Sequence, residues 1–491
     1  MIAVVVFGVW ISGRQRNASD FTVGDRNIPW WAVLFSIVAT ETSTVTFLSV
    51  PAIAYAGNLT FWQLSLGYVL GRYVIVYLLL PLYFRGELFT AYQVLHQRFG
   101  GATKQAASLL FIITRSLADG LRLFLTAIVL REMTGVDLSL CVVLTGVATI
   151  VYTYLGGIKA VVWTDVVQFF VYVGGAMLAG AILLEQIPGG LAEVVSFAQS
   201  QDKLQIFDFS WDLSSPYTFW AGVIGGAFVS LGSHGADQLM VQRYLCARNE
   251  REAGRALALS GWVVLVQFGL FLALGLGLAC FYASFPNEQF DRPDQVFARF
   301  IVTHLPVGAV GITLAAVFSA AMSTLSSSLN SLATATVNDL YLPMLKPQAS
   351  SEHQLAVTRW FTVLFGAVQI GVGIAGQRLQ SNVITSVLTI AAFTTGIILG
   401  VFFLAIVSKR ASQTAALVAL VGGLVMMTAI SFYPTLASLW MGPNKTPVAG
   451  LAWPWLAVVG SLGTLLLGLA ADRVVNGRGA TDKGADFESE I

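Results

Sequence analysis

The sequence predicts an all-α polytopic membrane protein, and two observations lead to that fold class. Of the 491 residues, 56% are hydrophobic and only 11% are charged, and the mean hydropathy is +0.75. A soluble protein of this size carries about a quarter charged residues, so the composition indicates a bilayer environment. The apolar residues also gather into segments that can cross a bilayer, which takes about 20 residues of helix. These segments predict about thirteen transmembrane helices.

The apolar segments follow one another along almost the whole chain. Residues 1–12 are too short to span, and we interpret them as a truncated first helix. We therefore expect one transmembrane domain at 1–472 and a disordered cytoplasmic tail at 473–491. The spanning segments are expected at about 29–55, 61–84, 104–132, 138–155, 160–186, 217–241, 255–284, 306–338, 357–377, 383–407, 412–433 and 450–472.

Basic residues in the connections predict the orientation. Placing the N-terminus outside puts most Lys and Arg residues of the connections, Arg243 among them, on the same side as the C-terminus. The positive-inside rule makes that side cytoplasmic. The longest opposite connections, at about 187–216 and 285–305, are rich in Asp, Pro, Gln and aromatic residues, which is typical of surface caps. We expect a multi-pass protein of the inner (plasma) membrane.

Composition and motif spacing argue against several classes of function. The net charge of +1 gives no support for nucleic-acid binding. Cys141, Cys246 and Cys280 have no metal-type spacing, and we interpret them as packing residues. The four histidines are scattered, so neither a paired nucleophile and base nor a metal cluster indicates an enzyme. No organic cofactor is expected.

A serine-rich stretch at 319–330 lies inside the predicted apolar helix 306–338. At helical spacing its hydroxyl and amide side chains share one face, where a bilayer offers no water. The hydroxyls could bond back to carbonyls one turn earlier and let helices approach closely. Alternatively, they could coordinate an alkali cation, which prefers oxygen ligands. The residues on this face are Ser319, Ser323, Ser326, Ser327, Asn330 and Thr334.

Two predicted helices are interrupted by polar residues. The first interruption lies between Ser36 and Thr46, and the second at 230–237. Five helices separate the starts of the two helices, which predicts two inverted five-helix repeats at about 29–186 and 217–407. In such repeats the first helices break near the midplane, where unwound carbonyls and helix ends hold ions and solute. The alternative is a pair of polar kinks facing a packed interior.

Six segments, in order along nearly the whole chain, resemble the sodium/solute symporter family, which includes sodium/glucose, monocarboxylate and bacterial sialic acid cotransporters. The resemblance implies a LeuT-like fold with one helix before the 5+5 inverted repeat and two after it. It also implies a sodium-coupled symporter rather than an enzyme. The segments are DFTVGDRNIPWW at 20–31, TFLSVPA at 46–52, TAYQVLHQRFG at 90–100, GGIKAVVWTDVVQ at 156–168, DQLMVQRYL at 237–245, and the serine stretch ending in NDLY at 338–341.

The resemblance implies a principal sodium site between the first broken helix and the serine helix. Its ligands would be two carbonyls of the broken helix, and one carbonyl and two hydroxyls of the serine helix: Ala39, Thr42, Ala320, Ser323 and Thr324. Some members hold a second sodium, and the matching positions here are Asp165, Ser323, Ser326 and Ser327. For Asp165 the alternative is a carboxylate near the inner interface that pairs with Lys159.

The resemblance also places the solute against the broken helix and its neighbours. An arginine that binds the substrate carboxylate in the sialic acid relatives matches Ala118 here, whereas Arg115 and Arg122 lie on the same helical face. Either arginine could bind a carboxylate, or both could pair with Asp119 in an internal ladder. The predicted substrate-binding residues are Glu41, Ser43, Thr46, Phe61, Ser65, Arg115 and Arg122.

Glu41 departs from the family, whose members mostly have an uncharged polar residue at this position. A carboxylate at midplane depth must be paired, protonated or in contact with solute. We expect it to be ionised and bonded to an arginine, either Arg72, Arg115 or Arg122. His234 is expected to be packed or hydrogen-bonded rather than a proton carrier.

The resulting functional prediction is a secondary active symporter that imports a small polar organic solute, such as a carboxylate or sugar-like compound, by alternating access. Sodium is the expected coupling ion, and the protein is expected to work as a monomer in the bilayer. The alternatives are a transporter-derived solute sensor without net transport and a membrane-embedded enzyme.

Overall fold

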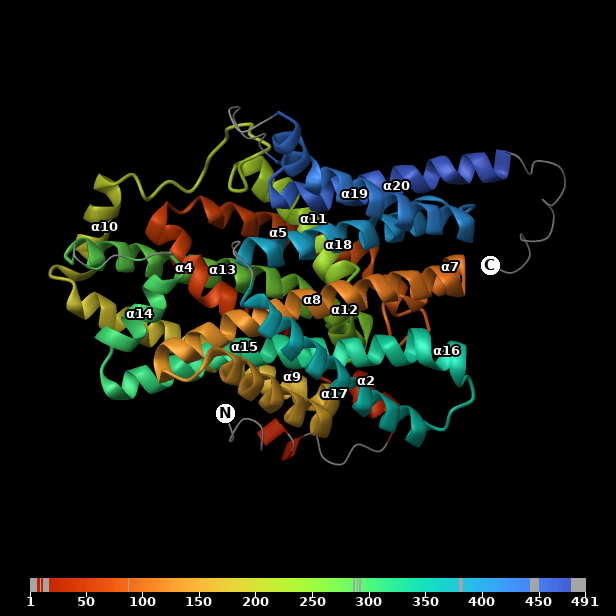
Figure 1. The fold of residues 1–491 in the computed structure, drawn as a ribbon, viewed down its shortest axis with the longest axis horizontal. Helices are drawn as coiled ribbons and strands as arrows, with labels where there is room; N and C mark the ends of the chain where they lie inside the picture. The colour runs from red at the N-terminus through yellow and green to blue at the C-terminus, as the bar shows by residue number, and fades with distance from the viewer. Residues whose placement is uncertain are drawn as a thin grey trace.

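The computed structural model describes residues 7–8, 10–11, 17–86, 88–285, 288, 290, 293–378, 383–441 and 450–477. Within these residues the chain is helical, and Ile28 and Ala247 form an isolated β-bridge. The longest helices run side by side as one bundle (Figure 1). The α-helices are α2 Ala18–Val23, α3 Trp30–Glu41, α4 Thr44–Ala56, α5 Gln63–Leu78, α6 Leu80–Tyr83, α7 Gln93–Phe99, α8 Gly101–Thr134, α9 Leu138–Gln186, α10 Gly190–Ser200, α11 Gly226–Gly235, α12 Gln238–Leu245, α13 Glu250–Ala283, α14 Gln295–His304, α15 Val307–Ala335, α16 Leu342–Leu345, α17 Ser351–Gly376, α18 Val383–Val407, α19 Gln413–Met441 and α20 Trp453–Gly477.

The two ends of the bundle are built differently. α10 and α14, which belong to the connections predicted to lie outside, are found at one end (Figure 1). The short helices α7 and α16 lie at the opposite end (Figure 1). The arrangement therefore places the two long connections on a common side, as the sequence predicts.

Both predicted polar interruptions are breaks in helices. Between α3 and α4, Thr42 and Ser43 are extended, and the segments on either side are bent by 59°. Between α11 and α12, Asp237 is also extended, and its carboxylate accepts from the backbone N–H of Leu239 at 2.9 Å. Asp237 thus caps the second half-helix. The bounds of the two inverted repeats stay a prediction.

The long helix α9 contains two of the predicted spans, 138–155 and 160–186. They meet at Gly157, whose φ of 56° and ψ of −161° interrupt the helical backbone. A Cβ at Gly157 would lie 2.8 Å from the ring of Phe21 and 2.9 Å from its carbonyl oxygen. Glycine is required here both by the positive φ and by the approach of α2.

The serine helix α15 lies at the centre of the bundle, where it packs against α9, α8, α17 and α3. Every residue from Ala316 to Ala335 is buried. A π-helical stretch, Thr336–Tyr341, continues α15 toward the α16 end. The polar face of this helix therefore meets protein rather than lipid, which is the condition for a functional polar site at membrane depth.

Seven helices of the described residues are long and apolar enough to cross a membrane, and the bent α3–α4 pair adds an eighth. This number is below thirteen because some of the predicted spans are joined in one helix, interrupted by charges or broken into short halves. α9 has 49 residues, more than twice the length that one span needs. α8 is interrupted by charges, and α11 and α12 are the short halves of a broken helix. The segments agree with the predicted order without confirming a count of thirteen.

Both predicted terminal features lie largely outside the described residues. Of the expected first helix at 1–12, the residues 7–8 and 10–11 are described and helical. α20 continues to Gly477, five residues beyond the predicted end of the transmembrane domain at 472. The remaining tail, 478–491, lies outside the described residues.

Candidate functional site

A cavity of about 530 Å³ lies beside the two helix breaks. It extends from Glu41 and His234 at the breaks to Pro216 and Asp294 in the two long connections. Six of the seven predicted substrate-binding residues line it. They are Glu41, Ser43, Thr46, Phe61, Arg115 and Arg122.

Ser65, the seventh predicted substrate residue, does not line the cavity. Its side chain is fully buried in α5, and its hydroxyl donates to the carbonyl of Trp62 at 2.6 Å. The resemblance placed Ser65 against the solute, whereas in this structure Ser65 faces the packed interior.

The cavity has a polar and an aromatic side. The polar lining comes from the broken helices and from α8, and it includes Ser49 and Ser233, which the sequence analysis had not selected. The rings of Phe61 and Phe268 pack with centroids 5.3 Å apart, and Tyr68 lies against Phe268. A solute with a polar edge and an apolar or ring face fits these surroundings. The aromatic lining residues are Phe61, Tyr68, Tyr217, Phe268 and Trp453.

Glu41 forms an ion pair with Arg72 at the first break. Arg72 is fully buried and also donates to the hydroxyl of Ser260 at 2.7 Å. His234 Nε2 lies 3.2 Å from the same Arg72 nitrogen and 3.6 Å from the Glu41 carboxylate. Its other ring nitrogen lies 2.9 Å from the hydroxyl of Ser233. Of the three candidate arginines, Arg72 is thus the partner of Glu41, and His234 is hydrogen-bonded as expected.

A second charged group joins α8 to the other break. Arg115 donates to Asp237 and lies 3.7 Å from Asp119, whose carboxylate accepts from Arg122 at 2.5 Å. The predicted ladder of Arg115, Asp119 and Arg122 is therefore present, and Asp237 extends it. Asp119 is fully buried, whereas 18% of the Arg122 side chain remains exposed. Arg122 thus lines the cavity with a side chain that is not fully buried.

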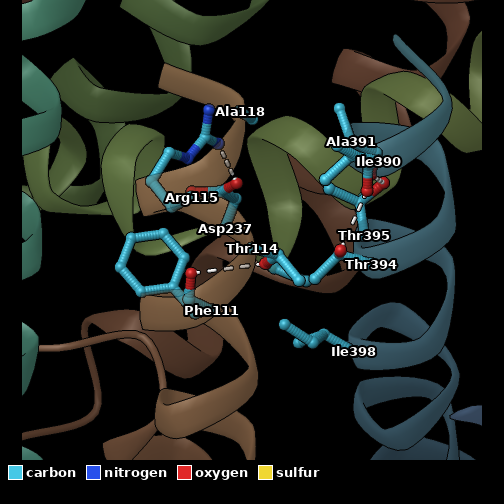
Figure 2. Close-up of a pocket in the computed structure, with 12 residues that line it drawn as sticks. Phe111, Thr114, Arg115, Ala118, Asp237, Ile390, Ala391, Thr394, Thr395 and Ile398 are labelled. Atoms are coloured by element: carbon cyan, nitrogen blue, oxygen red, sulfur yellow. Dashed lines mark hydrogen bonds and ion pairs between the residues drawn. The ribbon is translucent and has the colours of Figure 1, made fainter. Parts of the chain in front are cut away.

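Figure 2 shows a small pocket below this group, between α8, the break at Asp237 and α18. Arg115 extends toward Asp237 along its edge (Figure 2). Ala118 lines this pocket rather than the large cavity. The pocket shares Arg115, Ala391 and Thr395 with the large cavity, so the Arg115–Asp237 pair lies between the two spaces.

The predicted principal sodium residues lie where α3 ends against α15. The hydroxyl of Thr324 donates to the carbonyl of Thr40 at 2.9 Å, which brings the two helices into contact. The last turn of a helix has carbonyls without intrahelical partners, and here that turn includes Ala39 and precedes Thr42. The hydroxyl of Ser323, one residue before Thr324, lies on the same turn of α15. This contact brings the Thr324 hydroxyl to a backbone carbonyl of the last turn of α3, and the sodium site itself stays a prediction.

The serine face of α15 divides into two groups by its hydrogen bonds. Ser326, Ser327 and Ser331 donate back to carbonyls three or four residues earlier. Ser323 and Thr324 instead donate across to Asp165 and to Thr40. Back-bonding within the helix therefore applies to the first group, and cation coordination by the second group stays a prediction.

Asp165 is fully buried at the centre of this polar cluster. One carboxylate oxygen accepts from Ser323 at 2.6 Å, and the other accepts from Ser36 at 2.5 Å. The second oxygen also lies 3.3 Å from a guanidinium nitrogen of Arg243. The alternative pairing of Asp165 with Lys159 is not found, because the Lys159 ammonium pairs with Asp20 at 2.5 Å and lies 3.4 Å from Asp25.

Arg243 is the residue that the sequence analysis placed wrongly. It was expected in a cytoplasmic connection, yet its side chain is fully buried in α12. The predicted span ended at residue 241, and α12 continues to Leu245. An error of four residues at the end of a helix was enough to assign this buried charge to a solvent-exposed connection.

Two broken helices around a central polar helix, with a cavity beside the breaks, define a secondary transporter of LeuT-like fold. A family model, the sodium:solute symporter family, matches residues 21–423, and the chain belongs to this family. It is a sodium-coupled secondary active symporter that moves a small solute across the membrane by alternating access, as the sequence predicts.

Individual relatives agree with this assignment. The human sodium/iodide cotransporter is 31% identical over 87% of this chain and 68% of its own length. The sodium/sialic acid symporter SiaT of Proteus mirabilis (strain HI4320) is 29% identical over 88% of each chain. The substrate-bound, outward-open structure of a Na⁺-coupled sialic acid symporter superposes with a TM-score of 0.85, at 28% identity over 96% of each chain.

Proposed function

We propose that this symporter imports a small organic carboxylate that has an apolar or sugar-like body. The observation that carries the proposal is Arg122, which lines the cavity and forms an ion pair with Asp119 while 18% of its side chain stays exposed. A guanidinium presents five N–H donors in a planar fork, so one carboxylate partner leaves donors for a second carboxylate.

Charge balance in the cavity supports an anion that travels together with sodium. Glu41 is paired with Arg72, and Arg122 and Arg115 are paired with Asp119 and Asp237. The charges near the two breaks thus offset one another, and Asp294 adds a carboxylate at the end of the cavity that faces the long connections. A carboxylate solute would bring one negative charge, and one sodium ion nearby would compensate it. The sialic acid relatives named above transport a carboxylated sugar.

For the coupling ion we propose the principal site at the contact of α3 and α15. Ser323 donates its hydroxyl proton to Asp165, which leaves the oxygen lone pairs of Ser323 for a cation. Sodium prefers such neutral oxygen ligands to sulfur or imidazole. The proposed ligands are the carbonyls of Ala39, Thr42 and Ala320 and the hydroxyls of Ser323 and Thr324.

Sodium at this contact would couple to the solute through the first break. Ala39 and Thr42 flank Glu41, so an ion that holds the end of α3 also positions a wall of the cavity. Entry of one sodium ion contributes about 2.3 kcal/mol per 100 mV of membrane potential. We place the protein in the inner (plasma) membrane, with the N-terminus outside and the C-terminus in the cytoplasm. We expect a monomer to carry out transport, because the cavity is built within one chain.

Thermal-shift screening of the purified protein tests the solute class. Carboxylates, neutral sugars and amino acids are added with sodium or with choline, and melting temperatures are compared. We expect carboxylates to raise the melting temperature, and to raise it more with sodium than with choline. Uptake of the hits into proteoliposomes then separates a symporter from a sensor. Stabilisation by neutral solutes alone would contradict the proposed carboxylate.

A further inference from the structure

Four aromatic side chains line the cavity in a run that leads from the long connections toward the first break. The ring centroids of Tyr217 and Phe61 are 5.4 Å apart, and those of Phe61 and Phe268 are 5.3 Å apart. Phe268 is in turn 6.2 Å from Tyr68, which lies one turn before Arg72 on α5. Each ring thus contacts the next at a distance typical of aromatic pairs. We call these four residues the aromatic wall.

Gln63, the first residue of α5, attaches Tyr217 to the rest of this wall. Its side chain is fully buried, and its Nε2 donates to the backbone carbonyls of Thr60 and Tyr217, each at 3.0 Å. Its Oε1 accepts from the backbone N–H of Asp208 at 3.1 Å. The carbonyl of Asp208 accepts from the N–H of Phe219 at 2.6 Å, which closes the loop between these two residues. One amide group therefore joins α5 to both sides of this loop.

The backbone of Tyr217 depends on such bonds for its position because Tyr217 lies in a turn, before the helical residues begin at Phe219. The π-helical stretch that follows, Ala221–Gly225, packs tightly on the start of α5. A Cβ at Gly222 would lie 2.9 Å from the carbonyl carbon of Gln63. Gln63 thus stands where α5 meets the start of the second broken helix, and its side chain fixes the turn in front of that helix.

We infer that Gln63 is a positioning residue that holds Tyr217 against Phe61, so that the aromatic wall is complete when the solute binds. The inference rests on the proposed function, because it assigns this wall to the apolar or ring face of a carboxylate solute. Aromatic rings offer such a face a large contact area. Gln63 does not line the cavity, so its effect on the solute passes through Tyr217.

A double-mutant cycle in the purified full chain tests the inference, with the ring carboxylate benzoate as the probe and sodium present. Tyr217→Ala should raise the Kd of benzoate roughly 3- to 10-fold, because it removes one aromatic contact. Gln63→Met, which keeps the length of the side chain and removes its hydrogen bonds, should raise the Kd by a similar factor. The double variant should be no weaker than Tyr217→Ala, because Gln63 then has no ring to position. Gln205→Met, at an exposed glutamine of the same connection, is the matched control.

Amide hydrogen exchange gives a readout that needs no solute. Exchange over 205–219 should be faster in Gln63→Met than in wild type, and exchange over α14 should be unchanged.

Three results would overturn the inference alone. They are wild-type exchange in Gln63→Met, a further loss of affinity when Gln63→Met is added to Tyr217→Ala, and wild-type affinity in Tyr217→Ala when Phe268→Ala binds benzoate more weakly. The last comparison decides even if Gln63→Met does not fold. A wild type that does not bind benzoate, or equal affinity in wild type, Tyr217→Ala and Phe268→Ala, would refute the proposed solute site together with the inference.

Discussion

The hydroxyl of Thr324 donates to the carbonyl oxygen of Thr40 across 2.9 Å, and this hydrogen bond joins the centre of α15 to the last turn of α3. One residue earlier, Ser323 donates to Asp165 on α9. Three helices thus meet at the place where the first broken helix ends. An ion that binds there can favour one arrangement of these helices over another, which is the physical requirement for coupling.

Replacing Ser323 by alanine should abolish the sodium dependence of binding and transport while the protein still folds. The change removes one proposed ligand and one hydrogen bond to Asp165, at a cost in stability of about 1–3 kcal/mol. Sodium titrations of the melting temperature measure the loss. Ser331→Ala is the control, because Ser331 only donates back to Ser328 on the same helix. Sodium dependence equal to wild type in Ser323→Ala would refute the site.

Replacing Glu41 by glutamine should destabilise the protein and change its solute preference. Arg72 is fully buried and would lose its anionic partner, and breaking a buried pair costs about 3–5 kcal/mol. The cost should fall toward the lower value because 14% of the Glu41 side chain is exposed. Thermal unfolding in detergent measures the effect, with the exposed Glu193→Gln as the control. An unchanged melting temperature would mean that the pair does not contribute to stability.

Replacing Arg122 by alanine should reduce uptake of carboxylates far more than uptake or binding of neutral solutes. A charge-assisted hydrogen bond to a carboxylate contributes about 1.5–3 kcal/mol, so we expect roughly a 10- to 100-fold loss of apparent affinity. Arg131→Ala is the control, because Arg131 lies exposed on the same helix α8. Competition assays with the hits of the screen give the affinities. An equal loss for charged and neutral solutes would indicate a structural role for Arg122.

Replacing Gly157 by alanine should destabilise the kink in α9. A φ of 56° with a ψ of −161° is a conformation essentially restricted to glycine and costs an L-residue about 1–3 kcal/mol, and the new methyl group would meet Phe21 at 2.8 Å. Gly174→Ala on the same helix is the matched control, because no atom lies within 4 Å of its added Cβ. Unfolding midpoints of the two variants are compared. A Gly157→Ala protein as stable as the control would show that the backbone relaxes at this position.

Much of the architecture could be predicted because its signals are local. Hydrophobicity in runs of about 20 residues locates the membrane segments, whatever they pack against. The polar interruption around Thr42 predicts a break, because carbonyls freed by unwinding need polar partners in the membrane. The hydroxyl stripe on α15 follows from the helical period alone. These features needed no knowledge of neighbouring helices.

The pairing of the buried charges depended on the tertiary structure. Asp165 is six residues from Lys159 in the chain and 78 residues from Arg243, yet it pairs with Arg243. Glu41 had three candidate arginines, and only the packing of α5 against the break selects Arg72. Sequence distance does not determine such pairs, because the rotation and tilt of each helix decide which side chains meet. A buried charge is stabilised only by the partner that packing brings into contact with it.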